Sequence, residues 1–412
     1  MTAHTPLLEK LAAEYGTPLY VYDLERVDAA RRDLFGALPD GFEVFYAFKA
    51  NPHVELVRAL RTGEGPACKA EISSAGELAA ALEAGYPGTD ILYTGPGKTR
   101  DELAGALAGG VRLFSAESLS DLTHIGAAAR AHGVHAEALL RINSATAGAG
   151  TSIRMTGKPT QFGIDSETVA GIAAQLREVP GVSVAGLHLF SQSNARDEQS
   201  LIAELLHSID VAAAMQEDLG VRLRILDIGG GFAAPYAQAG GRDRYPGLRA
   251  ALEEKLDAAF PGWRQGEPRL AVESGRYLVG DSGTLLAGVS NVKVSRGRKF
   301  VILDAGINTF GGMSGLGRLL PVSVAVDTED NGRAVEKASL VGPLCTPGDI
   351  LGREIEVPEA AEGDVLTIPN TGAYGPTASL LMFLGRPAPT EAVVRGDEIV
   401  HVSRIEHIRT PV

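Results

Sequence analysis

Residues 44–63 read VFYAFKANPHVELVRALRTG and set a pattern that most of the chain repeats. A short run of aromatic and β-branched residues, typical of a strand, is followed by apolar residues at helical spacing, and the stretch ends at a glycine, a common helix stop. Helical stretches fit between most of the strand candidates. Eight runs are strand candidates, namely residues 44–49, 70–74, 91–95, 111–116, 137–142, 184–190, 224–230 and 269–274.

Strands that alternate with helices predict parallel βαβ units, and eight such units favour a closed (β/α)8 barrel over an open doubly wound sheet. After about residue 280 the chain alternates apolar and polar residues around glycine turns, which is typical of antiparallel strands. We therefore predict an α/β protein with a (β/α)8 barrel at residues 27–278. Residues 1–26 and 279–412 would form an all-β domain of sandwich or barrel type, with residues 18–24 as a strand that could pair with the C-terminal sheet.

Composition excludes several classes of function. The 412 residues carry a formal charge of −13, so binding to nucleic acid or to an anionic membrane surface is not expected. Two cysteines, Cys68 and Cys345, make no disulfide framework, and we expect a cytoplasmic protein. The N-terminus lacks the features of a signal peptide, and no apolar stretch approaches the roughly 20 residues that span a bilayer.

Polar residues collect at the carboxyl ends of the predicted strands, where the functional groups of a (β/α)8 barrel gather. Desolvation at the barrel mouth would lower the pKa of Lys49 and suit its amine for Schiff-base chemistry, although a lone strand-end lysine can simply reach solvent. Glu71 could orient a cationic group or be exposed. The strand-end set is Lys49, Glu71, Ser73, Arg141, His188, Ser191, Gly229, Gly230, Gly231 and Glu273.

Other motifs also have two interpretations each. The glycine run could bring backbone N–H groups to a phosphate or form a tight turn. Glu273 and Arg276 of ESGR could form a surface ion pair, or Glu273 could keep a pyridine nitrogen protonated. His188 could offer a flat ring or be structural. Cys345 of GPLCTPGD and Tyr374 of NTGAYG could serve a site or fill the core.

In their order along the chain, these motifs resemble the fold-type III decarboxylases that depend on pyridoxal 5′-phosphate (PLP), among them ornithine and diaminopimelate decarboxylases. The resemblance covers nearly the whole chain and implies a homodimer with shared active sites. It implies catalytic roles for Lys49, which would carry PLP, for His188 on the pyridine ring and for Glu273 on the ring nitrogen. Cys345 of the other subunit would protonate the decarboxylated carbon. No metal is expected.

The resemblance also assigns the residues that bind the cofactor and the substrate. The implied PLP-binding set is Lys49, Glu71, Arg141, His188, Ser191, Gly229, Gly230, Gly231, Glu273, Gly275, Arg276 and Tyr374. The candidate substrate contacts are Thr346, Arg318 and Tyr374. In relatives that act on basic amino acids an acidic residue binds the distal amine at the position of Thr346, and losing such a contact costs about 1.5–3 kcal/mol.

Thr346 therefore argues against ornithine, lysine and diaminopimelate as substrates. The segments SSAGEL, TGPGK and GPLCTPGD look closer to a subgroup that acts on amino acids tethered to carrier proteins, such as the glutamyl- and 3-methylaspartyl-carrier-protein decarboxylases of butirosin and macrolactam biosynthesis. The resemblance thus implies α-decarboxylation of a 3-methylaspartyl, aspartyl or glutamyl group on an acyl carrier protein. The candidate docking clusters are Lys293, Arg296, Arg298 and Lys299, or Arg242, Arg244 and Arg249; either could equally be a solvated surface turn.

Three other functions remain open. A free amino acid such as diaminopimelate could be the substrate, although Thr346 argues against it. A racemase could use the same barrel, but Glu273 argues against this because the racemases of the family pair the ring with arginine. A non-catalytic PLP-binding regulator is disfavoured by the presence of both Lys49 and Cys345.

Overall fold

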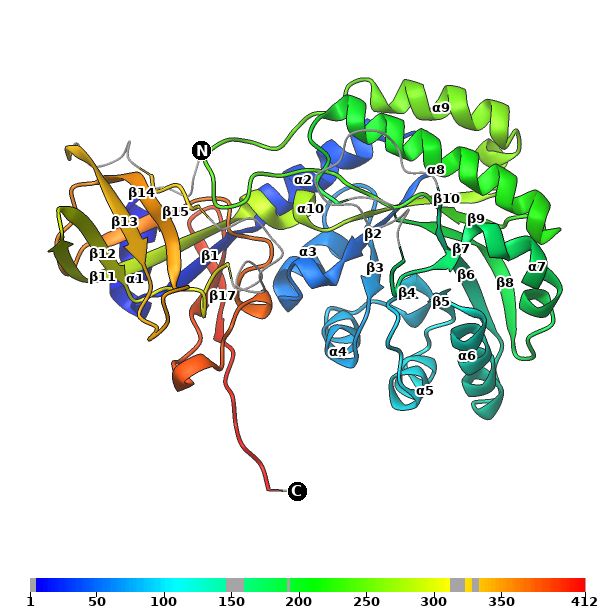
Figure 1. The fold of residues 1–412 in the computed structure, drawn as a ribbon, viewed down its shortest axis with the longest axis horizontal. Helices are drawn as coiled ribbons and strands as arrows, with labels where there is room; N and C mark the ends of the chain where they lie inside the picture. Colours follow the sequence, from blue (N-terminus) through cyan, green and yellow to red (C-terminus); the bar gives the residue numbers. More distant parts are fainter. Residues whose placement is uncertain (1–4, 146–158, 191–192, 312–322, 328–332, 412) are drawn as a thin grey trace.

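The computed structural model describes residues 5–145, 159–190, 193–311, 323–327 and 333–411. Figure 1 shows an elongated molecule with two lobes, a barrel surrounded by helices and a lobe built mainly of strands. None of the helices in these ranges is long and apolar enough to cross a membrane.

The first lobe is a closed ring of eight parallel strands. Pairing runs from β5 through β4, β3, β2, β10, β9 and β8 to β6, and β5 also pairs with β6, which closes the ring. The predicted barrel is confirmed and the open sheet is wrong, and each of the eight strand candidates overlaps one strand of the ring. These strands are β2 (Glu43–Ala47), β3 (Lys69–Ile72), β4 (Ile91–Tyr93), β5 (Leu113–Ala116), β6 (Ala136–Asn143), β8 (Val182–Leu189), β9 (Ile225–Asp227) and β10 (Arg269–Ser274).

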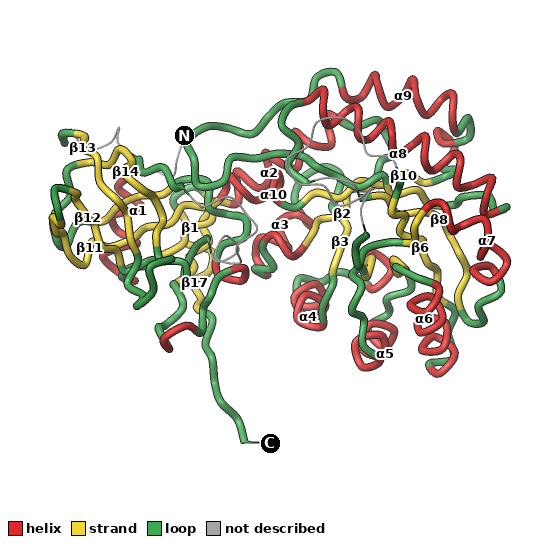
Figure 2. Tube along the Cα trace, in the orientation of Figure 1, coloured by secondary structure: helices red, strands yellow, loops and turns green. Residues whose placement is uncertain are grey.

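Helices cover the outside of the ring, as the tube in Figure 2 shows. Several begin at a side chain that caps the first free N–H groups, for example Thr99, which forms a capping box with Glu102. The short strand β7 (Ile164–Asp165) adds to β6 outside the ring. The helices of this lobe are α2 (Leu24–Ala37), α3 (Val54–Thr62), α4 (Ala75–Glu83), α5 (Arg100–Ala108), α6 (Leu119–Ala131), α7 (Ser166–Arg177), α8 (Glu198–Leu219), α9 (Leu248–Ala259) and α10 (Arg276–Val279).

The second lobe is one sheet to which both ends of the chain contribute. β1 pairs antiparallel with β11 and parallel with β16, so residues 18–24 do join the C-terminal sheet. β12 and β13 are also parallel, so the sheet is mixed, whereas the alternation of residues predicted antiparallel strands only. Its strands are β1 (Leu19–Asp23), β11 (Gly283–Ser295), β12 (Arg298–Leu303), β13 (Val335–Val341), β14 (Ile350–Pro358), β15 (Val365–Ile368), β16 (Thr390–Arg395) and β17 (Glu398–Arg404).

One helix of this lobe was not expected in an all-β domain. α1 (Thr5–Tyr15) buries Leu7, Leu8 and Leu11 against Leu19 of β1 and Leu286 of β11. The apolar residues of α1 recur at helical spacing, so its sequence already carried the signal for this element. The lobe is therefore mainly, but not entirely, β.

Strands β8 and β9 pack so closely at Gly186 that only a glycine fits there. A Cβ atom built on Gly186 would lie 1.7 Å from the carbonyl oxygen of Ile225. Because that oxygen belongs to the neighbouring backbone, a larger residue forces the two strands apart, and the ends of β8 and β9 carry His188 and Asp227.

We expect Gly186→Ala to lower the free energy of unfolding by at least about 1–3 kcal/mol, the usual effect of overpacking a core. The matched control is Gly171→Ala in α7, where no atom lies within 4 Å of the added Cβ, and which should stabilise the chain by roughly 0.5–1 kcal/mol. Thermal unfolding of both full-length variants followed by circular dichroism gives the comparison. Equal melting temperatures would contradict the close strand packing.

Candidate active site

Lys49 lies in the short turn that directly follows β2. The strand stops at Ala47, and Lys49 is the central residue of a 3-10 turn at Phe48–Ala50 whose other two side chains are buried. The lysine side chain is 42% exposed, and its amine donates to Glu71 Oε2 at 3.0 Å and to Oε1 at 3.3 Å. Thr94 at the end of β4 donates its hydroxyl to Glu71 Oε1 at 2.5 Å. Glu71 therefore does orient a cationic group, and that group is Lys49.

The pKa of Lys49 differs from the expectation drawn from sequence. Desolvation of the amine at the barrel mouth would by itself lower it, but the negative charges of Glu71 and Glu273 outweigh that effect and raise the pKa above its ordinary value. The expected lowering was wrong because it considered desolvation without the neighbouring carboxylates. The side chain is thus held as an ammonium ion next to Glu71.

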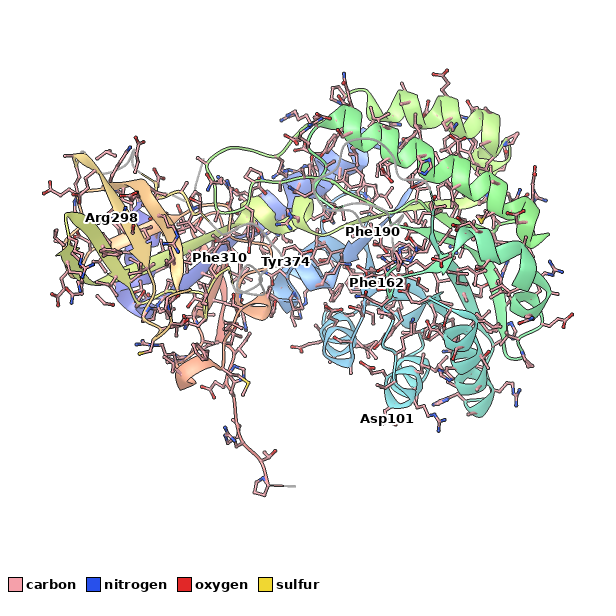
Figure 3. All side chains as sticks on the ribbon, viewed as in Figure 1. Asp101, Phe162, Phe190, Arg298, Phe310 and Tyr374 are labelled. Atoms are coloured by element: carbon pink, nitrogen blue, oxygen red, sulfur yellow. The ribbon has the colours of Figure 1, made fainter. Side chains whose placement is uncertain are left out.

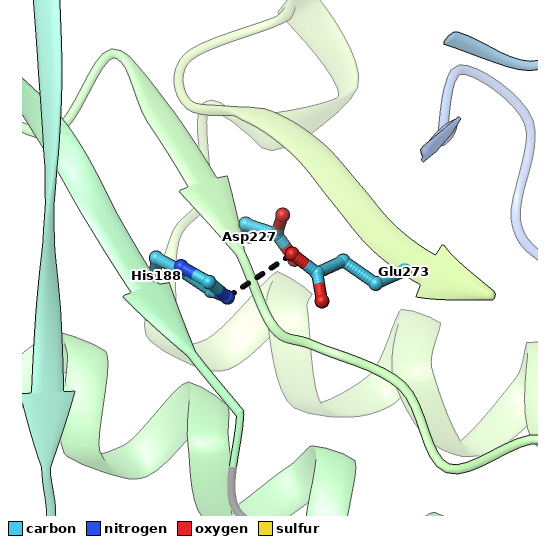
Figure 4. A group of neighbouring side chains, drawn as sticks. All are labelled: His188, Asp227 and Glu273. Atoms are coloured by element: carbon cyan, nitrogen blue, oxygen red, sulfur yellow. Dashed lines mark ion pairs between the residues drawn. The ribbon is translucent and has the colours of Figure 1, made fainter. Parts of the chain in front are cut away.

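Three buried side chains meet at the ends of β8, β9 and β10, and Figure 4 shows His188, Asp227 and Glu273 turned toward one another. His188 Nε2 lies 3.1 Å from Glu273 Oε1, and Ser115 binds His188 Nδ1 at 2.7 Å. Burial disfavours the charged forms of His188 and Glu273, yet their mutual attraction dominates and raises the pKa of His188 while lowering that of Glu273. The contact therefore favours the charged form of both side chains.

Arg141, near the end of β6, is held by a second buried carboxylate. Its Nη1 donates to Glu117 Oε1 at 3.1 Å, and Glu117 Oε2 accepts the N–H of Gly163 at 2.7 Å. The guanidinium lies over the rings of Phe162 and Phe190, at 4.7 and 5.7 Å from the ring centroids. Figure 3 labels both rings on the side of the barrel that faces the second lobe. The ion pair with Glu117 and the two aromatic rings thus fix the position of the Arg141 guanidinium.

The glycine run after β9 is packed so closely that it admits no side chain. A Cβ on Gly229, whose φ is +77°, would lie 2.2 Å from the carbonyl oxygen of Leu189, and one on Gly230 would lie 2.0 Å from that of Glu273. Gly231 has a φ of +125° and accepts the N–H of Ala195 at 2.7 Å. The run therefore keeps its backbone directly beside the ends of β8 and β10.

Arg276 and Tyr374 come together from different lobes. The guanidinium of Arg276, at the start of α10, lies 4.7 Å from the ring centroid of Tyr374 and 5.0 Å from that of Tyr236. Gly275, just before it, approaches the turn of Lys49 so closely that a Cβ would lie 2.9 Å from the Cβ of Ala50.

The turn that carries Lys49 is also bound directly to the second lobe. Tyr374 donates its backbone N–H to Ala50 O at 2.7 Å, and Asn51 Nδ2 donates to Gly372 O at 2.9 Å. A cavity of about 870 Å³ opens beside Lys49 between the lobes, with His53 and Glu77 of the barrel on one side and His401 of β17 on the other.

Cys345 and Thr346 lie on the loop between β13 and β14. Cys345 is exposed and Thr346 is half-buried. Asp349 shapes the loop, because its two oxygens accept the N–H groups of Ile307 at 2.8 Å and Leu344 at 2.6 Å. Cys345 does not line the cavity beside Lys49. Two candidates, Ser191 and Arg318, lie outside the described residues.

The sequence motifs left out four residues that the structure adds to this site. They are Thr94, Ser115, Glu117 and Asp227, which contact Glu71, His188, Arg141 and Gly229 respectively. Thr94 lies near the end of the predicted strand at residues 91–95 and Glu117 directly follows the one at 111–116, so the rule of polar strand ends could have found them. Asp227 lies two residues before the glycine run, in the stretch DIGGGF at residues 227–232.

The site suits a flat anionic ring that bears an aldehyde, which describes PLP. The buried atoms His188 Nε2 and Glu273 Oε1 have no hydrogen-bond partner in the part of the chain that the structure describes, although they lie close together. Glu273 could accept a ring N–H, the imidazole could lie against the ring, and the Lys49 amine could bind the aldehyde. Arg276 and the N–H groups of the glycine run could hold the phosphate.

Comparison with known proteins agrees with this chemistry. A family model described as "Pyridoxal-dependent decarboxylase, pyridoxal binding domain" matches residues 24–280. The L-glutamyl-[BtrI acyl-carrier protein] decarboxylase of Niallia circulans is 32% identical, with 93% of this chain and 90% of the relative covered. The diaminopimelate decarboxylase of Methanothermobacter thermautotrophicus is 33% identical, with 95% of this chain and 89% of the relative covered.

A solved structure extends the agreement to the whole fold. The diaminopimelate decarboxylase of Helicobacter pylori complexed with L-lysine is 25% identical, with a TM-score of 0.82, and the match covers 96% of this chain and 95% of that one. The sequence match of the barrel, the similarity of both lobes and the chemistry at the barrel mouth lead to one conclusion. The chain belongs to the pyridoxal-dependent decarboxylases and is a PLP-dependent amino-acid decarboxylase.

Proposed function

We propose that the chain removes the α-carboxylate of an acidic amino acid, 3-methylaspartyl, aspartyl or glutamyl, that is tethered through its side-chain carboxyl to an acyl carrier protein in natural-product biosynthesis. The observation that carries this proposal is Thr346, an uncharged residue beside Cys345 on the loop that Asp349 shapes. The distal thioester of such a substrate is uncharged. A threonine beside it therefore leaves no charged group without an oppositely charged partner. Similarity to the glutamyl-carrier-protein decarboxylase of Niallia circulans supports the same substrate class.

Decarboxylation of free diaminopimelate is the second candidate, because diaminopimelate decarboxylases are as similar to this chain as the carrier-protein enzyme is. The distal end of diaminopimelate carries an ammonium group, which gains from a nearby carboxylate. Thr346 cannot supply one. The two candidate substrates therefore differ in the charge of the group that would lie beside Thr346, which is neutral in the thioester and positive in diaminopimelate.

PLP, when bound, supplies an electron sink for the electron pair that loss of CO2 leaves on the α-carbon. Glu273 would accept the ring N–H, and its ion pair with His188 keeps it ionised for that task. Glu71 would hold the Lys49 amine within reach while substrate and lysine exchange places. Cys345 would then give its thiol proton to the α-carbon and become a thiolate.

The proton donor would come from a second copy of the chain. Cys345 is exposed on the β lobe, where a second chain could reach it. A homodimer that joins the barrel mouth of one chain to this loop of the other would complete two equal sites.

The candidate carrier-docking clusters differ in how their charges are used within the chain. Arg242 is only 11% exposed and pairs with Asp33 and Asp281. At the hairpin of β11 and β12, Arg298 and Lys299 also pair with carboxylates, but Lys293 and Arg296 are exposed. We therefore favour this hairpin for contact with an acidic carrier protein.

The substrate class is tested with aspartyl, 3-methylaspartyl and glutamyl groups loaded on an acyl carrier protein. After incubation with the enzyme and PLP, mass spectrometry should show at least one carrier that has lost the mass of one CO2. Lys49→Ala is the control, and it should also lack the absorption band near about 420 nm that a lysine-bound cofactor gives. Fast turnover of free meso-diaminopimelate with unchanged carriers would support the second candidate instead.

Thr346→Glu should move specificity toward a basic substrate. A new charge-assisted contact of about 1.5–3 kcal/mol corresponds to a roughly 10- to 150-fold rise in kcat/KM for diaminopimelate relative to the carrier-bound substrate. Thr346→Gln, similar in size but neutral, is the matched control and should not produce the rise. If both variants change the ratio equally, residue 346 does not read the distal charge.

Shared active sites predict complementation between two inactive variants. Lys49→Ala and Cys345→Ala are purified separately, mixed in equal amounts and allowed to exchange subunits. Half of the dimers should then be hybrids with one intact site, which returns about a quarter of wild-type activity. Mixing two batches of the same variant serves as the control. Failure of the mixture to recover activity, with hybrids shown by native mass spectrometry, would place Cys345 in the site of its own chain.

A further inference from the structure

Asp227 has no part in the chemistry set out above, yet it lies in the middle of the same cluster. It is the last residue of β9, which lies between β8 and β10, and it pairs in register with His188 of β8. The residue is completely buried. Its side chain faces those of His188 and Glu273 (Figure 4). One ring nitrogen of His188 and one carboxylate oxygen from each acid lie within 4.8 Å of one another.

The two oxygens of Asp227 are used differently. Oδ1 accepts the backbone N–H of Gly229 at 2.9 Å. Oδ2 is buried and has no hydrogen-bond partner among the described parts of the chain. A carboxylate charge left on such an atom would be costly, because no donor of the described residues compensates its desolvation.

The surrounding charges distinguish Asp227 from Glu273. Around this cluster lie His188 on β8, Arg141 on β6, Lys49 after β2 and the carboxylates of Glu71 on β3 and Glu273 on β10. Three of these, His188, Lys49 and Arg141, are cations that favour the ionised form of Glu273 and lower its pKa despite burial.

Asp227 responds in the opposite direction. Burial and the charges of Glu273 and Glu71 raise its pKa, and only His188 and the Gly229 N–H oppose them. Two carboxyl groups this close in a buried site do not both ionise readily, so one of them keeps a proton. The geometry assigns that proton to Asp227, because the direct contact of His188 goes to Glu273 and, among the described residues, the hydrogen bond to the Asp227 carboxyl comes from the Gly229 N–H.

We propose that Asp227 is a positioning residue that carries the one proton shared by this pair of buried carboxyl groups from acidic pH up to the approach of neutrality, so that Glu273 alone is then the anion at the ring nitrogen. The neutral acid fills the space beside Glu273 and His188 without competing for the positive charge of the imidazole. Only the part about the ring nitrogen depends on the proposed role of Glu273. The protonation of Asp227 is a property of the folded chain and holds for any substrate.

Protonation of Asp227 makes the stability of the folded chain depend on pH. The unfolded chain loses the Asp227 proton first, near the ordinary aspartate pKa of about 3.9, while the folded chain retains it to higher pH. Wild-type stability therefore falls as pH rises through the window between these two values and stays reduced above it. Asparagine does not titrate, and its amide oxygen can still accept the Gly229 N–H.

The melting temperature of Asp227→Asn minus that of wild type should therefore increase with pH by about 1–2 °C per pH unit between about pH 5 and the folded-state pKa, and then level off. The full-length chain is measured with and without PLP, and the trend should hold in both. Asp101→Asn, which removes an exposed carboxylate of α5, is the control and should give a flat difference. A flat difference for Asp227→Asn, or one that falls with pH, would overturn the proposal.

The positioning role is tested separately, through the absorption of the bound cofactor. In wild type, ionisation of Asp227 at high pH places a second negative charge beside the ring and should produce a pH-dependent change of the band. The same change should be missing in Asp227→Asn. An identical transition in both proteins would overturn the positioning role, and neither spectrum depends on which amino acid the enzyme decarboxylates.

Discussion

The parallel pairing of β2 with β10 is the constraint on which the site depends. It joins the first and last strands of the ring and sets Glu273 opposite Phe45, so the turn that follows β2 comes directly beside the end of β10. Lys49 and Glu273 are far apart in the sequence, and only closure of the barrel brings the negative charge of Glu273 to bear on the lysine amine. Without that closure the residues would stand at opposite edges of an open sheet.

The mouth of the barrel is organised by pairs of opposite charges, each built on a buried carboxylate. Glu71 binds Lys49, Glu117 binds Arg141, and Glu273 faces His188. Each pair offsets part of the desolvation of its members, and each orients a group that would face the cofactor. Asp227 differs from these carboxylates, since it is equally buried but, among the described residues, the hydrogen bond to its carboxyl comes from the backbone N–H of Gly229.

Much of the fold followed from local patterns in the sequence. The eight strands of the ring were predictable because each is a short apolar run followed by a helical stretch. The mixed sheet of the second lobe was not, because alternation of side chains does not tell whether the neighbouring strand runs parallel, as β16 does beside β1. The candidate residues could be found at strand ends and in motifs. The raised pKa of Lys49 could not, since it depends on distances to Glu71 and Glu273 that only the folded chain fixes.

The hydrogen bonds from Tyr374 to Ala50 and from Asn51 to Gly372 have a consequence for the construction of hybrid enzymes. They join the turn that carries Lys49 to a loop of the other lobe. Neither lobe alone therefore supplies all the contacts that hold the lysine amine in place. A chimera that takes its barrel from one decarboxylase and its β lobe from another would pair two partners that were not selected together. Grafting the segments around residues 49–51 and 370–375 from one parent should preserve the alignment of the lysine, whereas a cut at the lobe boundary alone would not.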